Sequence, residues 1–136
     1  MAKRTVSMAY KGISIYIHIM KVVYIAHPIG GDVYGNLEKI KHIVRCVNLK
    51  EKDTIPFVPY YSDVVSMDDE NPIERAKGFK NNLHLIQYCD ELRLYGDEIS
   101  KGMISEIERA KELQIPIIPM TEETIIDWEL FCFNSL

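Results

Sequence analysis

Apolar and polar residues alternate along this chain with two different periods, and the changes between periods predict strands and helices in turn. Short apolar runs rich in β-branched residues predict four strands, at residues 22–26, 55–58, 91–95 and 115–118. Apolar residues three and four positions apart predict helices over about 36–50, 72–88, 100–113 and onward from 121. Residues that favour a helix N-terminus stand at these starts, at Asn36, Asn71, Ser100 and Thr121. The polar segment 60–71 has the composition of a loop.

Strands that alternate with helices in this way build βαβ units and a parallel sheet. Because such crossovers are right-handed, the pattern predicts four to five strands in the order 2-1-3-4, with helices on both faces. The fold class is therefore α/β, a Rossmann-like or flavodoxin-like three-layer sandwich. In such sheets a ligand binds outside the carboxyl ends of the first and third strands, where the strand order reverses. We expect the ligand site at that edge.

Residues 1–19 precede this pattern and form an N-terminal extension of a single domain that spans residues 20–136. The start is basic and residues 13–20 are largely apolar, but Lys11 lies just before this run, His18 interrupts it and no small-residue cleavage site follows. Isoleucines at every second position from 13 to 19 have the period of a half-buried strand. The extension is therefore either a leader segment or an extra edge strand of the sheet.

Length and charge limit the partners that this chain can have. Its 136 residues suffice for one domain with an apolar core, and 47% of them are hydrophobic. The net charge is −4 and no block rich in Lys and Arg is present, so we expect no nucleic acid polymer as a partner. No run approaches the roughly 20 apolar residues of a membrane span, so we expect no membrane partner. A small anion held by backbone N–H groups remains compatible with this composition.

The three cysteines are far apart in the sequence and lack the spacing of a metal site; they are Cys46, Cys89 and Cys132. Each stands in an apolar or helical context, which is typical of free thiols in a reducing compartment. We therefore expect a cytoplasmic protein with no disulfide, no metal and no cofactor.

The first loop of the predicted site contains two adjacent glycines, Gly30 and Gly31, between His27 and Asp32. Backbone N–H groups at glycines can approach an anion closely, and the N-terminus of the following helix adds a favourable dipole. A plain turn between strand and helix explains the same residues. No Gly-Lys-Ser/Thr follows, so the loop is not that of a nucleoside triphosphatase.

The helix predicted from residue 100 carries the second candidate, Glu106. Met103 and Ile107 belong to the apolar face of this helix, whereas Glu106 lies on its flank. A carboxylate on such a flank can be partly desolvated and serve as a nucleophile or base. An ordinary glutamate at the edge of an amphipathic helix fits the pattern equally well.

Four ordered motifs in residues 20–120 resemble those of the nucleoside 2-deoxyribosyltransferase-like superfamily. They lie at residues 23–32 (VYIAHPIGGD), 56–59 (PFVP), 89–96 (CDELRLYG) and 100–116, where Ser100-x-Gly102-Met103-x-x-Glu106-x-x-x-Ala110 precedes Leu113-x-Ile-Pro. The chain is most similar to small, uncharacterised bacterial or phage members, related to nucleoside 5′-monophosphate N-glycosidases. The resemblance implies the fold derived above and a nucleoside or nucleotide as the small-molecule partner.

The resemblance also implies roles for individual residues. Glu106 matches the glutamate that attacks C1′ of a nucleoside or of its 5′-monophosphate, after which water or another base resolves the glycosyl-enzyme. Relatives that act on free nucleosides have an acid six residues earlier, whereas this chain has Ser100, like relatives that act on monophosphates. A hydroxyl at a helix N-terminus suits a phosphate, and together with Gly30 and Gly31 it favours a monophosphate ligand.

One residue departs from the pattern of the superfamily. Relatives usually have an acid that assists proton transfer at the position of Asn82, and an amide cannot act as a general acid or base. The chain is then a weak hydrolase, or it uses another acid such as Asp97, or it is a nucleotide-binding or sensor protein without turnover.

The remaining candidates each have a structural explanation beside the functional one. Tyr24 lies within the first strand, in the core or against the ligand, and Tyr60 follows the second strand, where it stacks on a base or packs in the loop. Asp32 either contacts ribose hydroxyls or has a structural role, as a helix cap or in closing its loop. We also place His27, Gly102 and Met103 at the site. The apolar residues 125–136 pack on the sheet or contact another subunit, and the resemblance implies a homodimer or higher oligomer.

Overall fold

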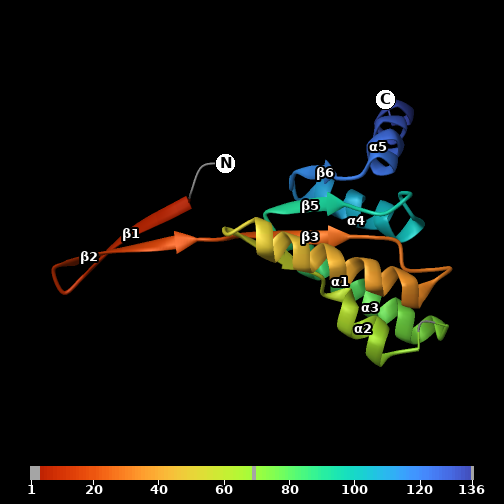
Figure 1. Ribbon diagram of the computed structural model, residues 1–136, viewed down its shortest axis with the longest axis horizontal. Helices are drawn as coiled ribbons and strands as arrows, with labels where there is room; N and C mark the ends of the chain where they lie inside the picture. The colour runs from red at the N-terminus through yellow and green to blue at the C-terminus, as the bar shows by residue number, and fades with distance from the viewer. Residues whose placement is uncertain (1–3, 69, 136) are drawn as a thin grey trace.

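The computed structural model describes residues 4–68 and 70–135, and its centre is a sheet of four parallel strands (Figure 1). The strands are β3 (Lys21–Ala26), β4 (Thr54–Phe57), β5 (Glu91–Leu94) and β6 (Ile117–Pro119). They are arranged in the order β4-β3-β5-β6, which is the predicted order 2-1-3-4 when the strands are counted from residue 21. In the register of this sheet Tyr24 pairs with Phe57 on one side and with Leu92 on the other.

Helices connect the strands and cover both faces of the sheet. They are α1 (Val33–Lys50), α2 (Tyr60–Ser66), α3 (Pro72–Leu85), α4 (Lys101–Glu112) and α5 (Glu122–Asn134), with a 3₁₀ turn at Ile86–Tyr88. Since β4 and β5 lie on opposite sides of β3, right-handed crossovers place α1 on one face and α3 and α4 on the other (Figure 1). The three-layer α/β sandwich is therefore confirmed.

Two local predictions were wrong. Residues 60–66 are helix α2 and not loop, because Tyr60 is buried and Val64, one turn later, packs against the same core. Helix α1 begins one turn before Asn36, where the Asp32 carboxylate accepts a hydrogen bond from the Gly35 N–H at 3.0 Å. Gly35 leaves room for this cap, because a Cβ there would collide with the Asp32 carboxylate in its capping position.

The N-terminal strands form a separate sheet. Strands β1 (Arg4–Tyr10) and β2 (Ile13–Ile19) pair antiparallel in a hairpin that extends away from the rest of the chain (Figure 1). Residues 13–19 thus form a strand, and its partner is β1 and not the edge of the parallel sheet. Within residues 4–68 and 70–135, no helix combines the length and apolar character that crossing a membrane requires.

A network of buried charges joins β5 to β3 and to the end of α1. Arg93 on β5 binds Glu91 at 2.6 Å, and it binds both oxygens of Glu51, which caps α1, at 2.8 and 2.9 Å. Lys21 at the start of β3 binds the second oxygen of Glu91 at 2.7 Å. The Arg93 side chain is only 5% exposed. Such charges are tolerated in the interior because each one has partners.

Arg93→Met should therefore lower the free energy of unfolding by about 3–5 kcal/mol, because Glu91 would keep its charge in the interior with only Lys21 as a partner. Urea unfolding followed by circular dichroism measures this loss. Arg109→Met removes a more exposed pair, with Glu112, and should cost less than about 1 kcal/mol. Equal losses in the two variants would show that the buried network does not stabilise the fold.

The pH dependence of this loss has a defined sign. Hydrogen bonds from Arg93 hold the pKa of Glu51 below its usual value, and at Glu91 those from Lys21 and Arg93 outweigh the opposing effect of burial. A lowered carboxyl pKa stabilises the folded state above the unfolded pKa, and this contribution is lost as the pH falls. The difference between wild type and Arg93→Met should therefore shrink below about pH 4.

Candidate active site

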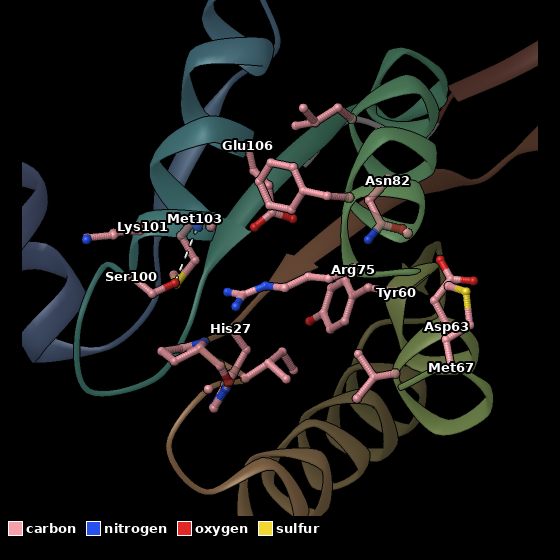
Figure 2. A pocket seen from close by; sticks show the side chains of 18 of the residues that line it. His27, Tyr60, Asp63, Met67, Arg75, Asn82, Ser100, Lys101, Met103 and Glu106 are labelled. Carbon is pink, nitrogen blue, oxygen red and sulfur yellow. Dashed lines mark hydrogen bonds between the residues drawn. The ribbon is translucent and has the colours of Figure 1, made fainter. Parts of the chain in front are cut away.

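A hollow of about 320 Å³ opens beside the carboxyl end of β3, the predicted edge of the sheet (Figure 2). The loop from His27 to Gly30 forms one wall, α2 and α3 form another, and the start of α4 forms a third. Several of the residues singled out from the sequence meet here: His27, Gly30, Tyr60, Asn82, Ser100, Gly102, Met103 and Glu106. Their separate positions in the chain become one site because β3 and β5 are neighbours in the sheet.

Glu106 lies at the floor of this hollow, with its carboxyl group pointing into it (Figure 2). The flanking α4 residues Met103, Ile107 and Ala110 are fully or almost fully buried, and they hold Glu106 at 8% exposure. The carboxyl group forms no ion pair with any described residue and no hydrogen bond of good geometry. Burial raises its pKa to about 7, and the nearby Tyr24 hydroxyl acts in the opposite direction. Near neutral pH this carboxyl group is therefore partly protonated and partly ionised.

Two more polar atoms in this region lack hydrogen-bond partners in the described chain, the hydroxyl of Tyr24 and the Oδ1 atom of Asn82. Tyr24 is wholly buried in the core, and burial followed by the Glu106 charge raises its phenol pKa. Asn82 is 8% exposed on α3 and lines the hollow. Leaving a buried polar atom unpaired costs about 1–3 kcal/mol. We therefore expect water or a polar ligand to satisfy these atoms.

Tyr60 lines the hollow, but its hydroxyl donates a hydrogen bond to the Ile25 carbonyl at 2.5 Å. Its ring centroid lies 6.0 Å from that of Tyr24, so the ring belongs to the apolar core beneath the site. This placement fits a wall residue that supports a ligand better than a loop tyrosine free to stack.

Ser100 is the N-cap of α4, and its hydroxyl accepts a hydrogen bond from the Met103 N–H at 3.3 Å. The remaining N–H groups of the first turn have no partners within the helix. Gly102 adds no side chain to this wall, and a Cβ there would lie 3.5 Å from the Phe79 ring. Ser100 and Glu106 thus lie on one helix six residues apart, a rise of about 9 Å.

The loop after β3 is held in place by internal contacts. The Asn36 amide donates hydrogen bonds to the carbonyls of Ile29 at 3.0 Å and Gly30 at 3.3 Å. Burial lowers the pKa of His27, and its ring Nδ1 lies 2.7 Å from the Pro28 carbonyl. The neutral ring therefore donates this hydrogen bond. The loop backbone around Gly30 is fixed before any ligand binds.

A second loop packs against this one from behind. Gly96, which follows β5, has φ +97°, a conformation that favours glycine. A Cβ at Gly96 would lie 2.6 Å from the Pro28 Cδ atom and 3.5 Å from the His27 ring. The loops after β3 and β5 therefore interlock at a position that only glycine fills.

Four of the candidates lie outside the lining of the hollow: Tyr24, Gly31, Asp32 and Asp97. Gly31 has φ +86° and is exposed, and Asp32 is an exposed cap of α1. Asp97 is exposed as well, and the neighbouring Glu98 lines the hollow in its place. Tyr24 lies below the floor, next to Glu106, and is not part of the surface of the hollow.

Sequence reasoning missed several lining residues, most of them on α2 and α3: Asp63, Met67, Arg75, Gly78, Phe79 and Lys101. Arg75, Gly78, Phe79 and Asn82 follow the spacing of one helix face. This spacing was a usable signal, but the face is chemically mixed and escapes a search for apolar periodicity. Among the described residues, no group of three or more His, Cys, Asp or Glu side chains is placed to hold a metal ion.

Solved structures with a fold similar to that of this chain include the following two. One is described as a 2-deoxyribosyltransferase from the psychrotolerant bacterium Bacillus psychrosaccharolyticus, with 19% identity and a TM-score of 0.55, and the match covers 72% of this chain and 70% of that one. The other is a conserved protein from Enterococcus faecalis V583, with 18% identity and a TM-score of 0.53, over 86% of this chain and 76% of that one. No curated protein sequence matches.

A protein-family model covers residues 21–120, which run from the start of β3 to the residue after β6. The matched segment contains the whole parallel sheet and every residue that lines the hollow, and it excludes the hairpin and α5. The chain therefore has the nucleoside 2-deoxyribosyltransferase-like fold and belongs to the family described as "Domain of unknown function (DUF7768)".

Proposed function

We propose that this protein cleaves the N-glycosidic bond of a nucleoside, preferably a nucleoside 5′-monophosphate, with Glu106 as the nucleophile. The observation that carries the proposal is the buried carboxyl group of Glu106, which pairs with no charged group in the described part of the chain and faces an open hollow. Burial of this kind costs free energy, and such groups cluster at functional sites. A protein described as a 2-deoxyribosyltransferase has a similar fold, which supports the substrate class.

The chemistry proceeds in two displacements at C1′ of the sugar. First, a Glu106 oxygen bonds to C1′ while the C1′–N bond breaks, and the base leaves with the bonding electrons and takes up a proton from the solvent. Second, a water oxygen bonds to C1′, the ester bond to Glu106 breaks, and the proton of the water passes to the solvent. If a second base replaces the water, the same intermediate gives transfer in place of hydrolysis. The ionised carboxylate is restored in either case.

The geometry of α4 supports the proposed preference for a monophosphate. Ser100 lies about 9 Å along the helix axis from Glu106, toward the helix N-terminus. A sugar whose C1′ meets Glu106 would direct its 5′-phosphate to Ser100 and the free N–H groups of the first turn. The fixed backbone near Gly30 lines the same hollow. A helix N-terminus favours a negative charge.

Glu106→Gln should lower base release from a panel of nucleosides and nucleoside 5′-monophosphates by at least about 10³-fold, because an amide cannot form the glycosyl ester. Chromatography of free base at pH 8, where the Glu106 carboxyl group is mostly ionised, measures the rate. Glu108→Gln is the matched control, since Glu108 is exposed on the same helix. Full activity of Glu106→Gln, or no base release by the wild type, would refute the proposal.

The same variant should stabilise the protein in a pH-dependent way. The Glu106 pKa is about 7 in the folded chain and about 4.3 in an unfolded one, so between these values the folded chain binds more protons. Stability therefore falls as the pH rises through this window, because a charge must be buried. At pH 8 Glu106→Gln should exceed the wild type by roughly 2–4 kcal/mol in urea unfolding, and at pH 4 by far less. A constant difference across this range would show that the carboxyl group is not desolvated.

A second candidate function is nucleotide binding without turnover. Asn82 favours it, because this buried amide occupies the wall of the hollow where an acid would assist the departing base. Asp97 does not line the hollow and so is badly placed to substitute. Calorimetric binding of a nucleotide by wild type, with no release of base, would favour this function over the first.

Asn82→Asp distinguishes a slow enzyme from a binding protein. A carboxyl group at this position can protonate the departing base, and such groups typically contribute about 10²–10⁴-fold. We expect base release to rise at least about 10-fold in the variant, measured by the same chromatography. Asn81→Asp makes the same charge change at a neighbouring residue outside the hollow and should leave the rate unchanged. Equal rates in the wild type and both variants would argue against a catalytic role at position 82.

A further inference from the structure

Arg75 lies in the first turns of α3, and its side chain enters the hollow. Figure 2 shows its guanidinium group pointing from α3 across the hollow towards the start of α4, where Ser100 caps the helix. No described residue forms an ion pair or a side-chain hydrogen bond with Arg75. Lys101 also lines the hollow, but its ammonium group points away from it (Figure 2). Of the two described cationic side chains that line the hollow, Arg75 and Lys101, Arg75 is thus the one that points into it.

The acidic lining of the hollow makes this cation necessary for an anionic ligand. Five carboxylate side chains line it: Asp63, Asp68, Glu74, Glu98 and Glu106. Without a cation inside, a phosphate dianion would meet mainly like charges, which repel it. An arginine suits this position, because its planar guanidinium group binds phosphate oxygens through two parallel hydrogen bonds.

Each of the helices α3 and α4 carries one polar group near its N-terminus and a second one deeper in the hollow. On α4 a hydroxyl at Ser100 precedes the carboxyl group of Glu106 by about 9 Å, and on α3 the cation of Arg75 precedes the amide of Asn82 by about 10 Å. Both helices begin at the carboxyl edge of the sheet, because each runs antiparallel to the parallel strands. Arg75 and Ser100 therefore stand at the edge, and Asn82 and Glu106 lie deeper.

We propose that Arg75 is the specificity-determining residue that selects phosphorylated over unphosphorylated nucleosides, by pairing with the 5′-phosphate held at Ser100. The proposal rests on the proposed function, since it takes the sugar to lie at Glu106. Phe79 and Asn82 on the same face of α3 then line the space left for the base. Arg75 adds affinity for the phosphate and does not take part in bond cleavage.

The test compares ligand pairs that differ only by the phosphate. Calorimetry measures the Kd of the four common 2′-deoxynucleosides and of their 5′-monophosphates for Glu106→Gln, which prevents turnover, and for Glu106→Gln combined with Arg75→Gln. We expect the phosphate to improve affinity about 10–100-fold when Arg75 is present and less than about 3-fold when it is replaced. The affinity for nucleosides should change less than about 3-fold. Lys77→Gln, exposed on the same helix outside the hollow, is the matched control.

The outcomes separate this proposal from the one on which it rests. If Arg75→Gln raises the Kd of nucleosides and of monophosphates by the same factor, or changes neither Kd, Arg75 does not select the phosphate, although the site still binds nucleosides. If no nucleoside or monophosphate binds to any variant and the wild type releases no base, both proposals fail. Arg75→Lys should restore part of the phosphate preference, whereas a purely structural role predicts no dependence on the phosphate.

Discussion

The burial of one carboxyl group, that of Glu106, is the constraint on which the rest of the site depends. Desolvation without an ion pair makes this group costly, and α4 keeps it in place because Met103, Ile107 and Ala110 anchor the helix to the sheet. The cost is small beside the free energy of the apolar core, so the fold tolerates it. Tyr24 and Asn82 add unpaired polar atoms to the same region. The fold thus places this unfavourable polar burial beside a hollow, where a ligand can relieve it.

Much of the fold could be predicted because its elements are long and regularly patterned. The parallel strands and the helices of twelve residues or more have clear periods, and right-handed crossovers then leave few strand orders. Helix α2 was missed because its seven residues make only about two turns, which is too short to establish a helical period. The start of α1 was misplaced because Asp32 and Asn36 are both good capping residues. The contact with Gly35, which distinguishes them, is visible only in space.

Some residues of the candidate site could also be predicted from the sequence, and others could not. Ser100 and Glu106 lie on one helix, so their spacing along it follows from the sequence alone. Arg75, Phe79 and Asp63 belong to walls whose approach to α4 depends on tertiary packing, and helical spacing alone does not show that these walls face α4. Asp97 and Glu98 are adjacent in a turn, and only the backbone path decides which of the two lines the hollow. Sequence spacing therefore identifies residues within one element and fails where two elements meet.

The contact between the loops after β3 and β5 affects how mutations can change the site during evolution. Gly96 has no side chain and does not line the hollow, yet a single methyl group there would displace the ring of Pro28, which does line it. A ligand-facing wall would then shift although no residue that touches the ligand had been exchanged. A substitution at position 96 would therefore change the shape of the ligand site, although residue 96 itself does not line it.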